Sequence, residues 1–318
     1  MDAKKELFGF LRYSKLIKFK GGEISITDDY ENACNWIEKI SHEDGFIYPP
    51  LSHRVKIDPI TGKDKGKIPK TERPSLLHKL PVTHQIIIEQ PVSDQEIRIS
   101  DAAFVVHLLS FIFGTRLQFK DWWFDSRVPT RPTLNIYIRH STVEDFISIA
   151  YQTWETWEEQ KRKWFNNILV MFSKAPSYEW DWERFTIEYM VFDGLFKLAE
   201  MLFGCTAKSH KKRFEALCNI FGIPFNEELI ERIYTLRNDL FHQTLWNNGQ
   251  PGTVNANSNA FYQPYHLRRF NSRLIPAILG YQTPYIKTGW WYMETIAFEK
   301  IEANNPLEIN AQQRVSVQ

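Results

Sequence analysis

The residues in this sequence best suited to chemistry are an arginine and, five positions later, a histidine: Arg237 and His242, with Asn238 directly after the arginine. A guanidinium group offers a phosphate a planar set of N–H donors. An imidazole, with an unperturbed pKa of about 6.5, exchanges protons near neutrality. Such a pair suits cleavage of RNA, where the substrate's own 2′-hydroxyl is the nucleophile, a group that DNA lacks. The reaction requires no metal, cofactor or protein nucleophile. We expect Arg237 and His242 to be catalytic, with Asn238 orienting the histidine.

The spacing of this pair is weak evidence by itself. With ordinary composition, an arginine followed five residues later by a histidine occurs by chance about once in two or three chains of this length. Arg73 and His78 have the same spacing, but Pro74 follows the arginine and no helical pattern surrounds them. The surrounding sequence therefore separates a candidate site from a coincidence.

Around the first pair, residues 229–245 have the pattern of an amphipathic helix, which we expect to begin at Asn226. At roughly 100° per residue, one narrow apolar stripe faces the core, with Asn238 and His242 on the opposite side. The core stripe consists of Leu229, Ile233, Leu236 and Leu240. Arg237 and His242 are about 140° apart on such a helix, so the long arginine side chain must reach round for both to address one phosphate.

A second apolar stripe flanks the first and consists of Ile230, Tyr234, Phe241 and Leu245. A helix with one buried face does not require it, so another surface must cover it. That surface is either a further helix of the same domain or the same helix of a second subunit, because a two-fold interface brings identical patches together. A homodimer would place two Arg237–His242 pairs side by side.

Charged residues elsewhere in the helical half are candidate partners of this pair. Glu188 and Asp193 are acidic groups on another expected helix. Two basic groups are expected to bind RNA at the rim of a cleft, although solvated helix faces are the alternative interpretation. Their members are Lys211, Lys212 and Arg213, next to Lys208, in the first group and Arg268, Arg269 and Arg273 in the second.

The patterning changes near position 140 and indicates an α+β chain. Residues 1–140 are expected to form a mixed α/β domain with strands at 22–26, 84–89 and 134–138, a helix between the last two, and a mobile lysine-rich loop at 58–74. Residues 141–285 are expected to form an all-α bundle. Its helices are expected at 141–173, 181–203, 209–221, from 226 onward and at 264–279, with a surface loop at 249–259. Residues 286–318 are a C-terminal extension whose end is expected to fray.

The composition of the chain limits how it could bind RNA and indicates the compartment in which we expect it. Lys and Arg number 39 against 38 Asp and Glu, so no overall positive field attracts a polyanion and any RNA binding must be local. Three cysteines fit a reducing compartment, and the N-terminus lacks the apolar core of a signal peptide, so we expect a cytoplasmic protein. The most apolar segment, residues 102–113, is too short to span a membrane and reads as a buried helix.

Other kinds of site are poorly supported. Cys205, His210 and Cys218 lack the spacing of a zinc finger and a fourth ligand. No glycine pattern typical of a nucleotide phosphate loop is present. His107, on the apolar helix, is expected to be a core or boundary residue.

Residues 233–242 resemble the motif helix of HEPN domains, in particular the ApeA-like group of bacterial and defence-associated proteins. Residues 212–217, 221–224 and 227–234 are similar to the segments that precede this motif, and residues 273–281 are similar to the family's closing helix. The resemblance covers residues 141–281 and leaves the N-terminal half unexplained.

The resemblance implies a helical bundle, frequently dimeric, with a metal-independent ribonuclease site at the dimer cleft. Matched to the motif, Arg237 and His242 take the catalytic roles and Asn238 supports them. Such domains occur in toxins and anti-phage systems, so an antitoxin or a phage-derived trigger is a possible partner. Because an unchecked ribonuclease harms its own cell, we expect the N-terminal domain to sense or regulate. Some family members only bind, so a non-catalytic module that binds RNA or a nucleotide, or that mediates interactions, is the alternative.

Overall fold

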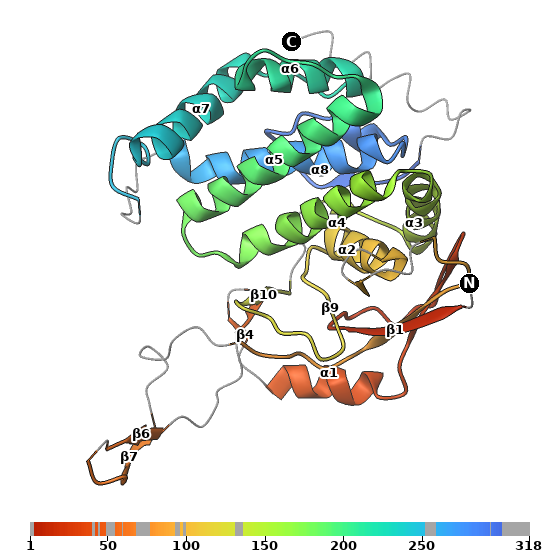
Figure 1. Ribbon diagram of the computed structural model, residues 1–318, viewed down its shortest axis with the longest axis vertical. Helices are drawn as coiled ribbons and strands as arrows, with labels where there is room; N and C mark the ends of the chain where they lie inside the picture. The colour runs from red at the N-terminus through yellow and green to blue at the C-terminus, as the bar shows by residue number, and fades with distance from the viewer. Residues whose placement is uncertain are drawn as a thin grey trace.

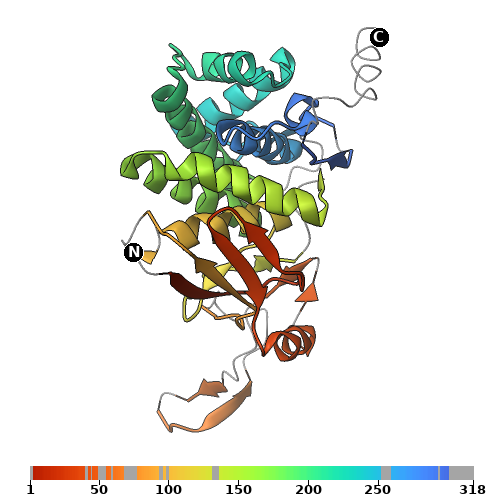
Figure 2. The ribbon, with the colours of Figure 1, turned by 90° about the vertical axis from the view of Figure 1, so that its right-hand side faces the viewer.

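The computed structural model describes residues 3–39, 42–43, 45–48, 55–58, 60–67, 77–92, 96–97, 100–130, 136–251, 259–292 and 294–300. Strands and two helices form the N-terminal part, and helices dominate from position 140 onward, which confirms the predicted α+β class (Figure 1). A sheet at one end of the molecule and a helical bundle at the other are stacked along the long axis (Figure 2). The expected fraying of the last residues falls outside the described part.

Five strands form the main sheet, in the order β2-β3-β8-β1-β9 and antiparallel throughout. They are β1 (Lys4–Gly9), β2 (Ile17–Phe19), β3 (Gly22–Ile26), β8 (His84–Ile88) and β9 (Gln118–Phe119). In β8 the side chains of His84, Ile86 and Ile88 are buried while Gln85 and Ile87 are half-buried, the alternation expected of a strand whose one face meets a core. The predicted strands at 22–26 and 84–89 are therefore confirmed.

Smaller elements surround this sheet. They are α1 (Tyr30–Lys39), β4 (His42–Glu43), β5 (Phe46–Ile47) and β10 (Val128–Pro129), of which the strands form a sheet in the order β10-β5-β4. A two-residue strand, β11 (Ile136–Tyr137), lies within the predicted strand at 134–138 and pairs in parallel with β12 (Ile296–Ala297).

Part of the predicted lysine-rich loop is a β-hairpin. β6 (Val55–Ile57) pairs with β7 (Asp64–Lys67), and the hairpin projects away from the body (Figure 1). Asp58 closes its turn by accepting the backbone N–H groups of Ile60 and Thr61 and an ion pair from Lys65. Such local bonds stabilise a turn without any apolar pattern, so the expectation of an irregular loop is wrong for Asp64–Lys67.

The helix α2 (Asp101–Phe113) lies between the sheet and the bundle. Ser100 caps its N-terminus, Gly114 ends it in the left-handed region at φ 62°, and every residue except Phe113 is buried. This is the expected buried helix, and His107 lies within it as expected. Burial and the charge of Arg116 lower the pKa of His107 to about 4, so its ring is neutral. Among the described residues, no helix has both the length and the apolar character needed to cross a membrane.

The bundle contains α3 (His140–Glu155), α4 (Glu159–Lys174), α5 (Asp181–Phe203), α6 (His210–Phe221), α7 (Glu227–Asn238) and α8 (Gln263–Ile278). The single helix expected at 141–173 is wrong, because the chain turns at residues 156–158. This turn lets α3 pack on β2 while α4 packs on α2 and α5. The helices expected at 181–203, 209–221 and 264–279 are confirmed. Ser209 caps α6 through the Lys212 N–H, and Gly204 and Gly222 end α5 and α6 with positive φ.

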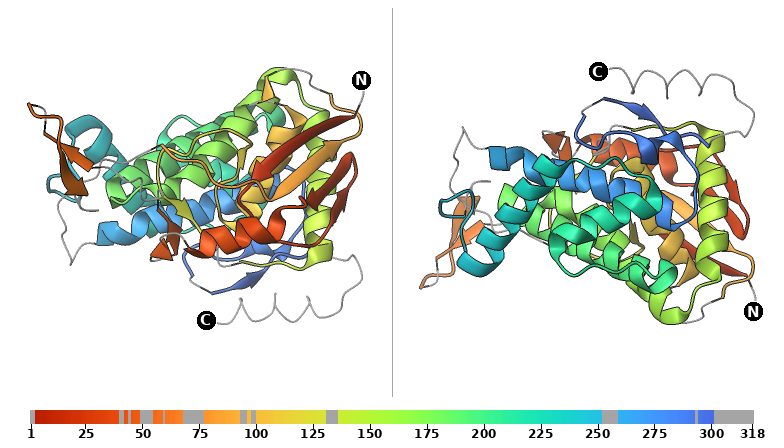
Figure 3. Two further views of the ribbon diagram at one scale, coloured as in Figure 1. Left: turned by 90° about the horizontal axis from the view of Figure 1, so that it is seen from below. Right: turned by 90° about the horizontal axis from the view of Figure 1, so that it is seen from above.

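Helix α5 is the centre of the bundle and packs against α4, α6 and α8 (Figure 3). Its buried Glu188 accepts hydrogen bonds from Arg268 Nη1 at 2.7 Å and from Asn271 Nδ2 at 2.9 Å, both on α8. Arg268 also donates to the Phe172 carbonyl oxygen at 2.6 Å and lies over the Phe172 ring. One buried ion pair therefore joins three helices.

This packing corrects two expectations. Arg268 and Arg273 are buried, Arg273 with only 1% of its surface exposed, and Arg269 is half-buried. Arg273 donates to the carbonyl oxygens of Thr288 and Gly289. Arg268 and Arg273 therefore form internal contacts and do not rim an RNA cleft, whereas an RNA-binding role for Arg269 stays a prediction. Glu188 is likewise occupied by Arg268 and Asn271 and is not a partner of Arg237 or His242.

The apolar core is continuous across the predicted boundary at position 141. One cluster of buried side chains runs from Phe8 in β1 through α2 and the bundle to Phe298, just after β12. Phe298 packs on Phe146, Tyr281 and Tyr285. The sheet, the bundle and the described part of the C-terminal extension therefore share one core.

We expect Arg268→Ala to lower the free energy of unfolding by about 3–5 kcal/mol, because it leaves the Glu188 carboxylate buried without its cation. Arg232→Ala is the matched control, since Arg232 pairs with Glu228 on an exposed face of α7. Such exposed pairs contribute roughly 0.5 kcal/mol. Denaturant unfolding followed by circular dichroism measures both values, and equal small losses would show that the buried pair does not hold the bundle together.

Candidate active site

The helix that carries the motif begins as predicted. Asn226 caps α7 by accepting the Leu229 N–H at 3.0 Å, and Glu227 and Glu228 occupy the first turn, where the helix dipole favours them. The predicted core stripe is confirmed: Leu229, Ile233 and Leu236 are buried, and Leu240 packs against the same cluster.

The end of this helix differs from the prediction. The α-helical geometry stops at Asn238, and residues Asp239–Gln243 form a π-helical turn. Thr244 ends the turn with φ 58°, a left-handed conformation that β-branched residues rarely adopt, and the Leu245 N–H returns to the Asp239 carbonyl oxygen. A π turn contains more residues per revolution than an α turn. The angle around the helix axis between two residues five apart is therefore smaller than in an α-helix, where it is about 140°.

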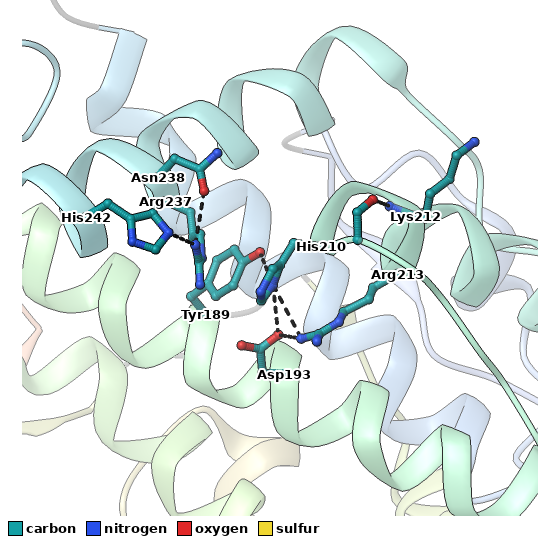
Figure 4. A network of polar contacts seen from close by, with 9 residues as sticks. Tyr189, Asp193, His210, Lys212, Arg213, Arg237, Asn238 and His242 are labelled. Carbon is teal, nitrogen blue, oxygen red and sulfur yellow. Dashed lines mark hydrogen bonds and ion pairs between the residues drawn. The ribbon is translucent and has the colours of Figure 1, made fainter.

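The wider turn brings the two motif side chains into contact. Arg237 Nη1 donates to His242 Nε2 at 2.7 Å and to Asn238 Oδ1 at 3.0 Å (Figure 4). A guanidinium has no acceptor atom, so the imidazole accepts through the Nε2 lone pair and carries its proton on Nδ1. Asn238 therefore holds the arginine and does not touch the histidine ring, contrary to the role expected for it. His242 is exposed to solvent at the end of the helix.

Aromatic rings hold the guanidinium in place. The Arg237 Cζ atom lies 5.9 Å from the centre of the Tyr189 ring and 5.4 Å from that of Phe241, distances typical of cation–π contacts. Arg237 Nε is buried and has no hydrogen-bond partner within the described structure. The outer nitrogens are thus the ones positioned to meet a ligand.

A second polar group lies beyond Tyr189, where α6 crosses α5. The Tyr189 hydroxyl contacts His210 Nδ1 at 3.2 Å (Figure 4). Arg213 Nη1 donates to Asp193 Oδ1 at 2.6 Å and approaches His210 Nδ1 at 3.3 Å. His210 Nδ1 and Asp193 Oδ1 are 3.6 Å apart. Asp193, expected to partner Arg237 or His242, instead contacts Arg213 and His210.

Burial and neighbouring charges set the protonation of this group. Burial lowers the pKa of His210, the positive charges of Arg213 and Arg237 lower it further, and a protonated His242 would add to this, against the opposite effect of Asp193. Burial also raises the pKa of Tyr189, so that phenol remains protonated. The protonation of His210 therefore responds to the charges of Arg237 and His242 as well as to its direct partners.

The basic residues expected to bind substrate are distributed over different faces of α6. Arg213 belongs to the network around Asp193, whereas Lys212 pairs with Glu215 and points away from the motif (Figure 4). Lys211 pairs with Glu227 and Glu231 and lines a separate groove beside α7. A substrate-binding role for Lys211, Lys212 and Arg213 stays a prediction, with Arg213 placed best for it.

The sequence suggests a role for His210 only as one member of a poorly supported zinc site, together with Cys205 and Cys218. The other members of that set are buried thiols, and Cys218 Sγ lies 3.8 Å from the Pro224 carbonyl oxygen. Across the described residues, no cluster of three or more His, Cys, Asp or Glu side chains is arranged to hold a metal ion. The second pair with the motif spacing differs from the first, because His78 is buried against the Phe124 ring and Arg73 falls outside the described part.

Comparison of the chain with protein-family models, with curated proteins and with solved structures finds no match. The resemblance to HEPN domains therefore depends on the motif helix and its flanking segments alone.

We expect His242 in the ligand-free protein to be protonated on Nδ1, because Arg237 donates to Nε2. Nitrogen-15 correlation spectra of the imidazole distinguish the two tautomers. Arg237→Ala should remove this preference, whereas Arg232→Ala, five residues earlier on an exposed face of α7, should leave it unchanged. An Nε2-protonated ring in the wild-type protein would contradict the contact.

Proposed function

We propose that this protein is a metal-independent endoribonuclease of the HEPN type, with Arg237 as the phosphate-binding group, His242 as the proton-transfer group and Asn238 holding the arginine. The observation that supports this most is the contact between Arg237 Nη1 and His242 Nε2 at a solvent-exposed helix end. One phosphodiester can reach both groups there.

The contact also suggests how the reaction begins. In the free protein, Arg237 occupies the lone pair that a general base needs. A substrate phosphate, being anionic, is a stronger acceptor than a neutral imidazole and draws the guanidinium towards itself. His242 Nε2 is then free to take the proton of the 2′-hydroxyl. The 2′-oxygen attacks phosphorus and leaves a 2′,3′-cyclic phosphate on one product and a 5′-hydroxyl on the other. DNA is not a substrate because it lacks the nucleophile.

We place this activity in the cytoplasm, as a regulated toxin or an anti-phage defence effector. An antitoxin partner or a phage-derived trigger would control it, and the N-terminal part is the proposed sensing region. Because the sheet and the bundle share one core, control acts within a single folded unit. The binding module without catalysis remains the competing proposal, and it predicts RNA or nucleotide binding that survives without cleavage.

We expect purified protein to cut total RNA in EDTA and to leave cyclic-phosphate ends. His242→Ala should slow cleavage about 10²–10⁴-fold through loss of proton transfer, and Arg237→Ala about 10²–10³-fold through loss of charge stabilisation. Arg232→Ala is the control, with activity like the wild type. The proposal fails if the wild type never cuts, even with candidate activators, or if both motif variants cut equally well.

We propose separately that the protein forms a homodimer that pairs two such sites. Of the second apolar stripe, Ile230 is fully buried within the bundle, whereas 45% of Phe241 is exposed next to Arg237. Phe241 is therefore the residue of the second apolar stripe that a partner subunit would cover, and it lies beside the motif.

Light scattering should give twice the chain mass for the wild type. Phe241→Asp should shift the protein towards the monomer, because a charge is then buried in the interface. Phe225→Asp is the matched control, since Phe225 is 44% exposed just before the same helix begins. A strict monomer at working concentrations that still cleaves RNA would refute the paired-site proposal.

A further inference from the structure

His210 lies in a row with the two motif residues. The order across the site is His242, Arg237, Tyr189 and His210 (Figure 4). His242 comes from the π-helical turn, Arg237 from the end of α7, Tyr189 from α5 and His210 from the start of α6. A phosphate bound to Arg237 would therefore have an imidazole on each side. Cleavage through a 2′-hydroxyl needs two proton transfers, one at the attacking oxygen and one at the leaving oxygen.

The hydrogen bonds give the two imidazoles opposite tautomers. His242 accepts from Arg237 at Nε2, so that nitrogen presents a lone pair. His210 faces Arg213 with Nδ1, and because arginine only donates, the proton of the neutral ring is on Nε2. When His210 takes up a second proton, Asp193 is positioned 3.6 Å from Nδ1 to stabilise the cation. One ring is arranged to accept a proton and the other to donate one.

We propose that His210 is the general acid of the reaction, an inference that rests on the ribonuclease activity proposed above. His242 removes the proton from the 2′-hydroxyl, the new bond forms between the 2′-oxygen and phosphorus, and the bond from phosphorus to the 5′-oxygen breaks. Protonated His210 gives its Nε2 proton to that departing oxygen. One subunit thus holds the base, the cation and the acid, and the second subunit need not supply a proton-transfer group.

The charges around His210 determine when it is protonated. Its charged and titratable neighbours are Asp193 and Tyr189 on α5, Arg213 on its own helix, Arg237 at the end of α7 and His242 in the π-helical turn. Burial and the two arginines lower its pKa in the free protein, so the ring is mostly neutral near pH 7. A bound phosphate offsets the charge of Arg237 and thereby favours the imidazolium. The neutral phenol of Tyr189 adds no charge.

Two alanine variants and two substrates test this assignment. The substrates are the same oligoribonucleotide with either oxygen or sulfur as the bridging atom of the leaving group, because a thiolate leaves without being protonated. His210→Ala should lose at least about 10²-fold in rate on the oxygen substrate and cleave the sulfur substrate at nearly the wild-type rate. His242→Ala should be impaired on both, since the base is needed for either.

His140→Ala is the matched control. His140 and His210 have 30% and 26% of their side chains exposed, and each lies 3.6 Å from a carboxylate, Glu144 or Asp193. The His140→Ala variant should cleave both substrates at the wild-type rate. His210→Gln, which retains a polar side chain at this position, should reproduce the pattern of His210→Ala if the alanine variant proves poorly folded by circular dichroism.

Equal impairment of the His210 variants on both substrates would assign His210 a merely structural role and overturn the proposal. So would unimpaired cleavage of the oxygen substrate. A pH profile adds an independent criterion: the rate falls at high pH as the acid loses its proton, and this limb should vanish in His210→Ala. If the wild type cuts neither substrate, or His242→Ala cuts both normally, the ribonuclease proposal itself fails.

Discussion

The buried carboxylate of Glu188 imposes the constraint on which the arrangement of the bundle depends. A charge without water must be matched by hydrogen bonds, and here Arg268 and Asn271 of α8 provide them. These bonds fix how α5 is rotated about its own axis. With Glu188 directed towards α8, the next residue, Tyr189, and Asp193 one turn later face α6 and α7. The internal ion pair therefore sets the position of the polar groups at the candidate site.

The site combines this rigid support with an irregular helix end. Tyr189 and Phe241 restrain the Arg237 guanidinium from two sides, and the π turn determines where His242 points. Non-standard turns and positive-φ residues such as Thr244 are found at functional sites more often than elsewhere, because surrounding contacts must compensate for the strain. The local geometry thus agrees with the chemistry that the residue types suggested.

Sequence patterns predicted what depends on local periodicity and caps. The helices from 181, 209, 226 and 264, the strands at 22–26 and 84–89, and the core stripe of α7 were all confirmed. What failed depends on tertiary contacts. The turn at 156–158 contains no glycine or proline to mark it, and the burial of Arg268 and Arg273 follows from partners distant in sequence. The π turn has no glycine or proline to mark it. His210 entered the site only through the crossing of α6 over α5.

The position of α2 has a consequence for protein turnover. This helix is buried along nearly its whole length, because α4 packs against one side of it and the sheet packs against another. A proteolytic fragment that began after it would expose a wide apolar surface on the bundle and would have no means to cover it. Degradation from the N-terminal side should therefore unfold the bundle together with the candidate site and release no folded helical fragment. The integrity of the candidate site would in this way depend on one buried helix that contributes no residue to it.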